Sequence, residues 1–228
     1  MHAFSFVVEE GRVIDAARYA AAARELGVST AALNRLRVRL SMVAGTRRAK
    51  LEIHGGTASL ELRPLPPAPA EITVAARPIR DERTLPAYSG PDLGWQRFTL
   101  AQTPAHEGLL VDATGRVVSA IMAPLVMLQH GRAYTSSHER TSSSIALDGV
   151  AEILAGQGVE LAHLPGGFIR SDLLSSEVWV IDPVYGARLV TTWLEYGTSR
   201  PARQWVERGA LPTHREVNEL RAQRAVAV

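Results

Sequence analysis

Side chains that could bind or transform a small molecule are gathered in four segments of this sequence. In chain order they are Arg48 and Lys50; Tyr88 and Ser89; Ser143 and Ser144; and Asp182, Tyr185, Gly186 and Arg188. Arginine binds carboxylate or phosphate through a planar fork of N–H donors, and a carboxylate such as Asp182 can act as a general acid or base. Together the four segments predict a site for a small anionic molecule.

Each segment also has an interpretation that needs no ligand. Ser144 before an apolar helix can serve simply as an N-cap, and Asp182 before a proline can serve simply to shape a turn. Tyr88 and Ser89 have no identifiable activating partner in the sequence. We expect acid–base chemistry from Asp182 or Tyr88, with the structural alternatives left open.

Lys50 is the only lysine in the sequence, and this limits the chemistry of the site. A Schiff base with a carbonyl compound needs a lysine amine. On a strand, Lys50 would share a face with Arg48 and could point into the same cavity. We favour the alternative in which Lys50 pairs with Glu52 or Glu61 or lies in solvent, so no Schiff base is expected at Lys50.

The composition is that of a globular protein. Of the 228 residues 46% are hydrophobic, the net charge is only +2 and the arginines are scattered, so no nucleic-acid-binding stripe is predicted. No apolar run approaches the roughly 20 residues that cross a bilayer, and the opening MHAFSFVVEEGR lacks the basic start of a signal peptide. With no cysteine and no histidine pair at metal-ligand spacing, no metal site is expected either. We therefore expect a cytoplasmic protein that binds neither nucleic acid nor membrane.

Two α+β portions must position these side chains. In the first we expect strands at Phe4 to Val8, Arg12 to Ile14, Ala49 to His54, Ala58 to Leu62 and Glu71 to Pro78, and helices at Ala16 to Leu26 and Ala31 to Val43. Asp15 is the expected N-cap of the first helix. A connector bearing proline and glycine sets the boundaries at residues 1–85 for the small portion, 86–98 for the connector and 99–228 for the larger portion with its helical tail.

The larger portion is expected to open with a meander, followed by a loop over Tyr134 to Ser144 and a helix over Ile145 to Gly156. The meander strands are Gly108 to Val111, Arg116 to Ala120 and Pro124 to Leu128. The remaining expected elements are strands at Val159 to Leu161, Glu177 to Ile181 and Arg188 to Trp193, and helices at Asp172 to Ser176 and His214 to Arg224.

Four segments, taken in order, carry a resemblance to a known family. They are the helix Ala16 to Val28, the strand that begins at Arg48, the meander start EGLLVD at Glu107, and the strand and loop EVWVIDPVYG at Glu177. Their order and spacing resemble the fold type IV pyridoxal-phosphate enzymes, which include the class IV aminotransferases and aminodeoxychorismate lyase. The resemblance spans about Phe4 to Trp193. It implies an α+β, D-amino acid aminotransferase-like fold with a cleft between two portions, Arg48 as a phosphate-binding residue, and a homodimer.

The departures from the family pattern fall on its chemistry. Ser89 stands where the resemblance places the lysine that holds pyridoxal phosphate, and Ser119 stands where it places the glutamate on the pyridine nitrogen. Pro124 replaces an asparagine, and the serine run 142–144 replaces the family's phosphate turn. Without the lysine there is no internal aldimine, and without the carboxylate the ring is a poor electron sink.

Three functions are open, and we favour the first. It is an enzyme of the lyase or isomerase type that acts on a small carboxylated metabolite in the old cofactor cleft without pyridoxal phosphate, and that binds this metabolite through Arg48, Arg188 and the serine run. The second is a catalytically inactive relative that serves as a binding or partner protein. The third is a pyridoxal-phosphate enzyme with a noncovalent cofactor, which the missing lysine disfavours.

Overall fold

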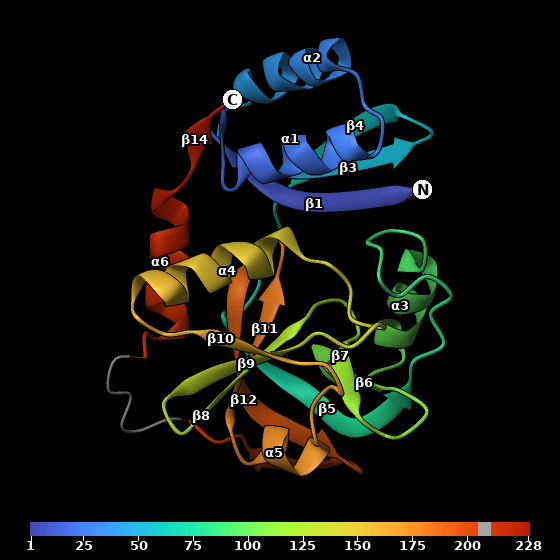
Figure 1. The fold of residues 1–228 in the computed structure, drawn as a ribbon, viewed down its shortest axis with the longest axis vertical. Helices are drawn as coiled ribbons and strands as arrows, with labels where there is room; N and C mark the ends of the chain where they lie inside the picture. The colour runs from blue at the N-terminus through green and yellow to red at the C-terminus, as the bar shows by residue number, and fades with distance from the viewer. Residues whose placement is uncertain (205–210) are drawn as a thin grey trace.

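Two β-sheets, each covered by helices, build the part of the chain that the computed structural model describes, residues 1–204 and 211–228. The smaller sheet has the strand order β14-β2-β1-β3-β4 and the larger has the order β10-β9-β8-β11-β12-β5-β6-β7, with β13 paired to β12. Figure 1 shows the smaller sheet with its two helices at the top and the larger sheet with its helices below.

The smaller sheet is antiparallel and packs its apolar face against two helices. Its strands are β1 (His2–Glu9), β2 (Arg12–Val13), β3 (Thr46–His54), β4 (Thr57–Pro64) and β14 (Val226–Ala227), and its helices are α1 (Ala16–Glu25) and α2 (Thr30–Ser41). Alternation along β3 buries Ala49, Leu51 and Ile53 against these helices and leaves Arg48 and Lys50 on the opposite face. The strand pattern thus places both basic residues on one face, as expected.

The larger sheet is mixed, with parallel pairing of β9 with β10 and of β5 with both β6 and β12. Its strands are β5 (Glu71–Arg80), β6 (Glu107–Val111), β7 (Val117–Ala120), β8 (Leu125–Gln129), β9 (Arg132–Ser136), β10 (Leu161–Leu164), β11 (Glu177–Asp182), β12 (Gly186–Glu195) and β13 (Thr198–Pro201). The remaining helices are α3 (Leu93–Ala101), α4 (Ile145–Gly156), α5 (Arg170–Leu174) and α6 (His214–Gln223). Helices α4 and α6 cover one face, and α5 packs against the other.

Most expected elements are confirmed, including the three strands between Gly108 and Leu128 and α4 at its predicted bounds. The expected meander is wrong, because β7 pairs with β6 whereas β8 lies elsewhere in the sheet, between β9 and β11. The loop expected over Tyr134 to Ser144 is wrong at its start, because residues up to Ser136 form β9, whose register with β8 and β10 is fixed by the sheet. Strand β5 belongs to the larger sheet although it precedes our boundary at residue 85. At the other end, β14 returns the chain to the smaller sheet, as Figure 1 shows.

Asp15 occupies the N-cap position of α1, but its capping role is wrong. Its backbone is left-handed, with φ 58°, and its side chain makes no capping hydrogen bond. Instead the carboxylate lies 3.6 Å from Arg221 of α6 and packs against Gly149 of α4. Tertiary contacts with two other helices thus override the local capping preference.

Among the residues that the structure describes, no helix is long and apolar enough to cross a membrane.

Candidate functional site

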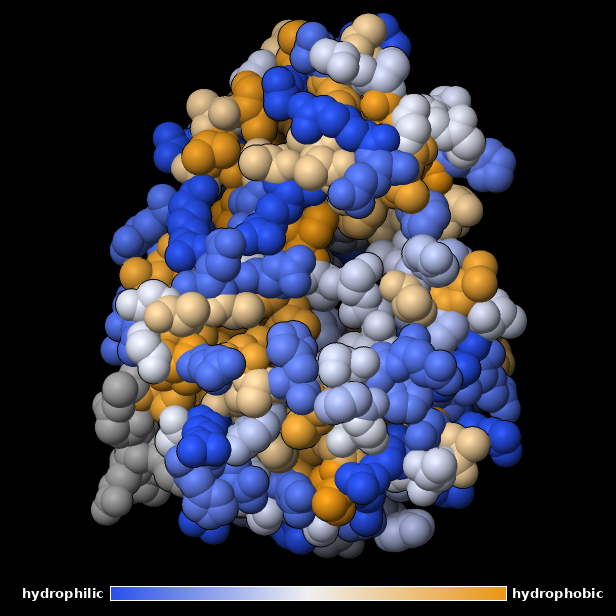
Figure 2. Space-filling model, in the orientation of Figure 1, coloured by the Kyte–Doolittle hydropathy of each residue, from blue (hydrophilic) through white to orange (hydrophobic). Residues whose placement is uncertain are grey.

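A cavity of about 570 Å³ lies between the two sheets. Its walls come from β1, α1 and β3 on the small-sheet side, and from the ends of β7 and β11, the start of α4, and α3 on the large-sheet side. The segment from Arg83 to Asp92, which joins the two parts, borders its mouth. Figure 2 shows the surface hollowed between the upper portion and α3.

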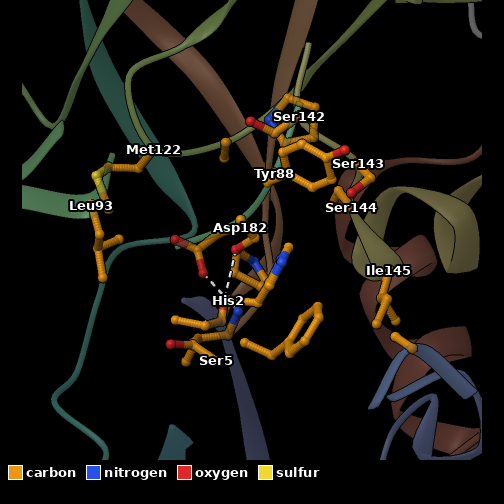
Figure 3. Close-up of a pocket in the computed structure, with 18 of the residues that line it drawn as sticks. His2, Ser5, Tyr88, Leu93, Met122, Ser142, Ser143, Ser144, Ile145 and Asp182 are labelled. Carbon is orange, nitrogen blue, oxygen red and sulfur yellow. Dashed lines mark hydrogen bonds between the residues drawn. The ribbon is translucent and has the colours of Figure 1, made fainter. Parts of the chain in front are cut away.

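Most of the residues that the sequence singles out are brought together in this cavity. Those that line it are Arg48, Tyr88, Ser89, Ser119, Ser143, Ser144, Asp182 and Tyr185. Lys50, Gly186 and Arg188 are not part of its lining. Figure 3 shows how Asp182, Tyr88 and the serine run approach one space from different elements, with His2 and Ser5 of β1 on another side.

Asp182 ends β11 and shapes the turn that follows. Its Oδ1 atom accepts hydrogen bonds from the backbone N–H groups of Val184 at 2.7 Å and Tyr185 at 3.0 Å. Within the described residues, Oδ2 accepts no hydrogen bond from the protein, and the side chain lines the cavity. Asp182 therefore has the turn role that any Asp-Pro sequence suggests and, in addition, one carboxylate oxygen for a ligand.

The serine run before α4 is committed to internal hydrogen bonds. Ser142 Oγ donates to the carbonyl of Pro86 at 2.6 Å, and Ser143 reaches the carbonyl of Ala87 through its N–H at 3.2 Å and its hydroxyl at 3.4 Å. Ser144 is the N-cap of α4 and accepts a hydrogen bond from the N–H of Leu147 at 3.2 Å. These hydroxyls attach the joining segment to α4.

Arg83 is a buried arginine behind the serine run that sequence reasoning missed. Its guanidinium forms two 2.9 Å hydrogen bonds with Asp81 and donates to Ser142 Oγ at 2.9 Å and, more weakly, to Ser119 Oγ at 3.4 Å. Arg140 binds the same carboxylate at 2.9 Å. Burial raises the pKa of Asp81, but the bonds from the two arginines outweigh burial and hold this pKa below its usual value. The charged sequence RDERT at residues 80–84 is typical of an exposed segment and does not predict such a network.

The joining segment is fastened to β1 at the mouth of the cavity. Ser89 Oγ donates to the carbonyl of Ala3 at 2.6 Å, and the N–H of Ala3 donates to the carbonyl of Ser89 at 3.0 Å. Gly90 has φ 120°, and a Cβ on it would lie 2.5 Å from the nitrogen of Ala3. Tyr88 is 53% exposed and meets the ring of His2 edge-on, with 5.3 Å between the ring centroids.

The predicted residues outside the cavity have other contacts. Lys50 Nζ lies 2.6 Å from Glu52, which is one of the two partners expected for it. Arg188 donates from Nε to the carbonyl of Pro69 at 3.0 Å. Gly186 packs directly against Asn218 and Arg221 of α6, so its missing side chain makes room for that helix.

Among the residues that the small-sheet side contributes are Arg48 of β3 and Arg18 and Tyr19 of α1. Arg48 Nη2 donates to Ser5 Oγ at 3.3 Å and forms no ion pair within the described part of the chain. Arg18 pairs with Glu152 of α4, which bridges the two portions. Tyr19 is 6% exposed. An alanine-rich helix with one tyrosine gives a weak signal, since such a tyrosine usually belongs to the core.

Glu107 is buried beneath the floor of the cavity. Its Oε2 atom accepts a hydrogen bond from the N–H of Met122 at 3.2 Å and so holds the turn that carries Met122, Ala123 and Pro124 into the cavity wall. Burial is the main reason that the pKa of Glu107 rises to about 8, and the negative charge of Asp182 contributes. The sequence marks this glutamate only as the start of a strand.

Comparisons with known proteins identify the fold. No family model and no curated protein matches the sequence. Among solved structures, a hypothetical aminotransferase from Mycobacterium tuberculosis has a TM-score of 0.73 at 15% identity, covering 98% of this chain and 87% of its own. The 4-amino-4-deoxychorismate lyase from Pseudomonas aeruginosa has a TM-score of 0.69 at 17% identity, covering 96% and 88%. An aminotransferase from Brucella abortus, bound to pyridoxal phosphate, has a TM-score of 0.72 at 15% identity, covering 97% and 88%.

The chain therefore has the fold of the fold type IV transaminases, the two-sheet α+β fold that the sequence resemblance implies. More particularly, its fold is similar over nearly the whole chain to those of a hypothetical aminotransferase and a 4-amino-4-deoxychorismate lyase. The predicted fold class is confirmed.

Proposed function

We propose that the protein binds a small carboxylated anion directly in the cavity between its sheets and acts on it by acid–base chemistry, as a lyase or isomerase, without a pyridoxal-phosphate Schiff base. The position of Lys50 carries this proposal. It is the only lysine of the sequence, its Nζ is paired with Glu52, and it does not line the cavity. A Schiff base in the cavity therefore has no lysine amine from which to form.

The residues that would surround the pyridine nitrogen of pyridoxal phosphate do not fit this cofactor either. Ser119, which the resemblance aligns with the glutamate of the pyridine nitrogen, has the guanidinium of Arg83 beside it at 3.4 Å. A guanidinium has donors and no acceptor, so it cannot stabilise a protonated ring nitrogen. A directly bound anion has no such requirement.

Arg48 and Asp182 have complementary roles in this proposal. Arg48 lines the cavity with donors left over after its bond to Ser5, and its planar fork suits a carboxylate. Asp182 is held in orientation by two backbone N–H groups on one oxygen, and its other oxygen can remove a proton from the bound molecule. Elimination and isomerisation require such a positioned base.

Binding is tested by calorimetric titration of the protein with succinate and with benzoate, which measures the affinity for each. Arg48→Ala is expected to weaken binding about 10-fold or more, since hydrogen bonds to charged groups contribute about 1.5–3 kcal/mol. Arg47→Ala is the matched control, because Arg47 is the exposed neighbour on the same strand and does not line the cavity. Equal affinities in the two variants would contradict binding at Arg48.

The absence of a Schiff base is tested by adding pyridoxal phosphate, reducing with borohydride and mapping the labelled lysine by mass spectrometry. The expected result is no labelled Lys50 beyond the level found in unfolded protein. Stoichiometric labelling that disappears in Lys50→Ala would overturn the proposal in favour of a pyridoxal-phosphate enzyme.

The assignment of chemistry to Asp182 is tested with Asp182→Asn, which keeps an oxygen for the two backbone N–H groups and removes the base. Carboxylates that bind wild type are screened for conversion by mass spectrometry, and the variant is expected to bind them and leave them unchanged. If wild type also binds but converts none of them, the protein is a binding protein of this fold and the enzymatic part of the proposal fails.

A further inference from the structure

Three tyrosines line the cavity, and they differ in what their hydroxyls contact. The hydroxyl of Tyr185 donates to the carbonyl of Pro66 at 2.8 Å, a normal hydrogen-bond length. Tyr88 is 53% exposed at the mouth, where water competes for its hydroxyl. Tyr19 is only 6% exposed, and its hydroxyl has the carbonyl of Ser5 as partner at 3.5 Å. This distance is well beyond the usual O–H···O range, so the phenol of Tyr19 keeps most of its donor capacity.

The ring of Tyr19 is held in place by packing. Phe6 lies against it with 4.6 Å between ring centroids at an interplanar angle of 33°, and Phe4 meets it edge-on at 6.1 Å and 76°. Both phenylalanines come from β1, and the tyrosine comes from the middle of α1. A side chain locked by such contacts presents its polar end in one direction, which lowers the entropic cost of binding through it.

Tyr19 and Arg48 both contact Ser5, through different atoms of that residue. The phenol of Tyr19 faces the carbonyl oxygen of Ser5, and Arg48 donates to the Oγ atom of the same residue. All three residues line the cavity. A neutral donor and a cation that both contact the same residue can each bind one oxygen of a single carboxylate.

The surroundings keep the phenol protonated. Burial is the largest effect and raises the pKa of Tyr19, and the negative charges of Asp15 on α1 and Asp182 on β11 raise it further. Arg221 on α6 lowers it by a smaller amount than burial raises it. Tyr19 therefore acts as a hydrogen-bond donor throughout the physiological pH range, and not as a base.

We propose that Tyr19 is a ligand-binding residue of this cavity, whose phenol donates a hydrogen bond to the same anionic group that Arg48 binds. The inference rests on the proposed function, because it needs an anion in the cavity. It adds a substrate requirement: the anion has an oxygen that accepts one neutral donor next to a guanidinium, as a carboxylate does.

Fluorine NMR of protein labelled with 3-fluorotyrosine tests this contact directly. The five tyrosines give separate labels, and Tyr19→Phe identifies the Tyr19 signal. Succinate and benzoate are the probes. The Tyr19 signal is expected to shift on titration, while those of Tyr134 and Tyr196, which lie outside the cavity lining, stay in place.

Affinity provides the second readout, because Tyr19→Phe keeps the ring contacts and removes only the hydroxyl. Calorimetry with the same probes is expected to show about 10-fold weaker binding. Tyr196→Phe is the matched control, since Tyr196 is exposed and lies outside the cavity lining. A change in affinity without a change in melting temperature distinguishes a ligand contact from a structural role.

The outcomes separate this inference from the proposed function. If the probes bind in an Arg48-dependent manner but the Tyr19 signal does not move and Tyr19→Phe binds as wild type does, the inference fails and the proposed function stands. If no probe binds at all, both fail. A shifted Tyr19 signal together with weakened binding in Tyr19→Phe supports the inference.

Discussion

The two walls of the cavity use their polar side chains differently. On the large-sheet side, Arg83 and the serines bond to each other and to backbone carbonyls of the joining segment. On the small-sheet side, Arg48 and Tyr19 each make one long hydrogen bond within the described part of the chain, at 3.3 and 3.5 Å, both with Ser5. Since a group that is fully bonded within the protein loses those bonds when it turns to a ligand, the small-sheet wall is better prepared to bind one.

The difference teaches that a polar residue in a cavity lining is a weak indication of a binding role. Ser142 and Ser144 face the same space as Arg48, yet their hydroxyls fix the joining segment and cap a helix. Apart from Asp182, whose Oδ2 is left for a ligand, the polar side chains of the large-sheet wall therefore form a support. On this view, substitutions of Arg83 and the serines reduce stability, whereas substitutions of Arg48 and Tyr19 reduce affinity.

The largest effect is expected for Asp81→Ala. Asp81 and Arg83 are 0% and 2% exposed at their side chains, so removing the carboxylate leaves a buried guanidinium without its counter-charge. Loss of one partner of a buried pair costs about 3–5 kcal/mol. Urea unfolding measures it, with Glu61→Ala as the control, because Glu61 forms an exposed pair with Arg63 that contributes well under about 1 kcal/mol. Equal losses in both variants would mean that the support is not rigid.

A smaller loss of unfolding free energy is expected for Gly90→Ala. This substitution disturbs the contact between the joining segment and β1. The new Cβ would lie 2.5 Å from the nitrogen of Ala3, in a backbone conformation with φ 120° that alanine rarely adopts. Strain of this kind costs about 1–3 kcal/mol. Gly94→Ala is the matched control, since nothing lies within 4 Å of its added Cβ. Thermal unfolding of the two variants checks the prediction, and an unstrained Gly90→Ala protein would show that the joining segment is free to move.

The fold was predictable from sequence because local signals agree with it. The apolar periodicity and serine cap of α4 predict its bounds, and alternation predicts the face of β3 that carries Arg48. Pairing between distant segments was harder to predict. Strand β5 joins the larger sheet between two parallel neighbours, one of which, β12, follows much later in the chain. The two-residue β14 has no pattern of its own.

The site was predictable only in part. Asp182 and Arg48 were found because their residue types and strand positions are informative. Arg83 and Tyr19 were missed because their importance depends on which groups surround them. Neither a buried ion network nor a phenol with only one long hydrogen bond can be recognised from the spacing of residues in the sequence. The same reason explains the serines, whose types suit an anion but whose hydroxyls have internal partners.

The pH dependence of stability tests whether the support beneath the large-sheet wall depends on a proton. Glu107 has an ordinary pKa of 4.5 and a folded-state pKa of about 8. The folded protein therefore holds a proton that the unfolded chain releases, so this contribution to stability is complete below 4.5 and is lost as the pH rises towards 8. In this window the slope is about 1.4 kcal/mol per pH unit.

Glu107→Gln keeps an acceptor for the N–H of Met122 and removes the ionisation. Its stability, measured by urea unfolding across the same window, is expected to lack the decline that wild type shows. Identical slopes in the two proteins would mean that Glu107 is not the titrating group. Affinity for succinate, by contrast, should change little between the two proteins at acidic pH, where both carry a neutral side chain at this position.

The smallest effect, and the sharpest test of the two-wall comparison, comes from the serines. Ser144→Ala removes the N-cap of α4 and is expected to cost about 1 kcal/mol of unfolding free energy. Ser143→Ala removes a 3.4 Å hydrogen bond at an exposed position and should cost less. Neither change should weaken succinate binding measurably, because both hydroxyls already have partners within the protein. If both serine variants lose affinity and Tyr19→Phe does not, the roles of the two walls are the reverse of those described, and the α4 side is the one that binds the anion.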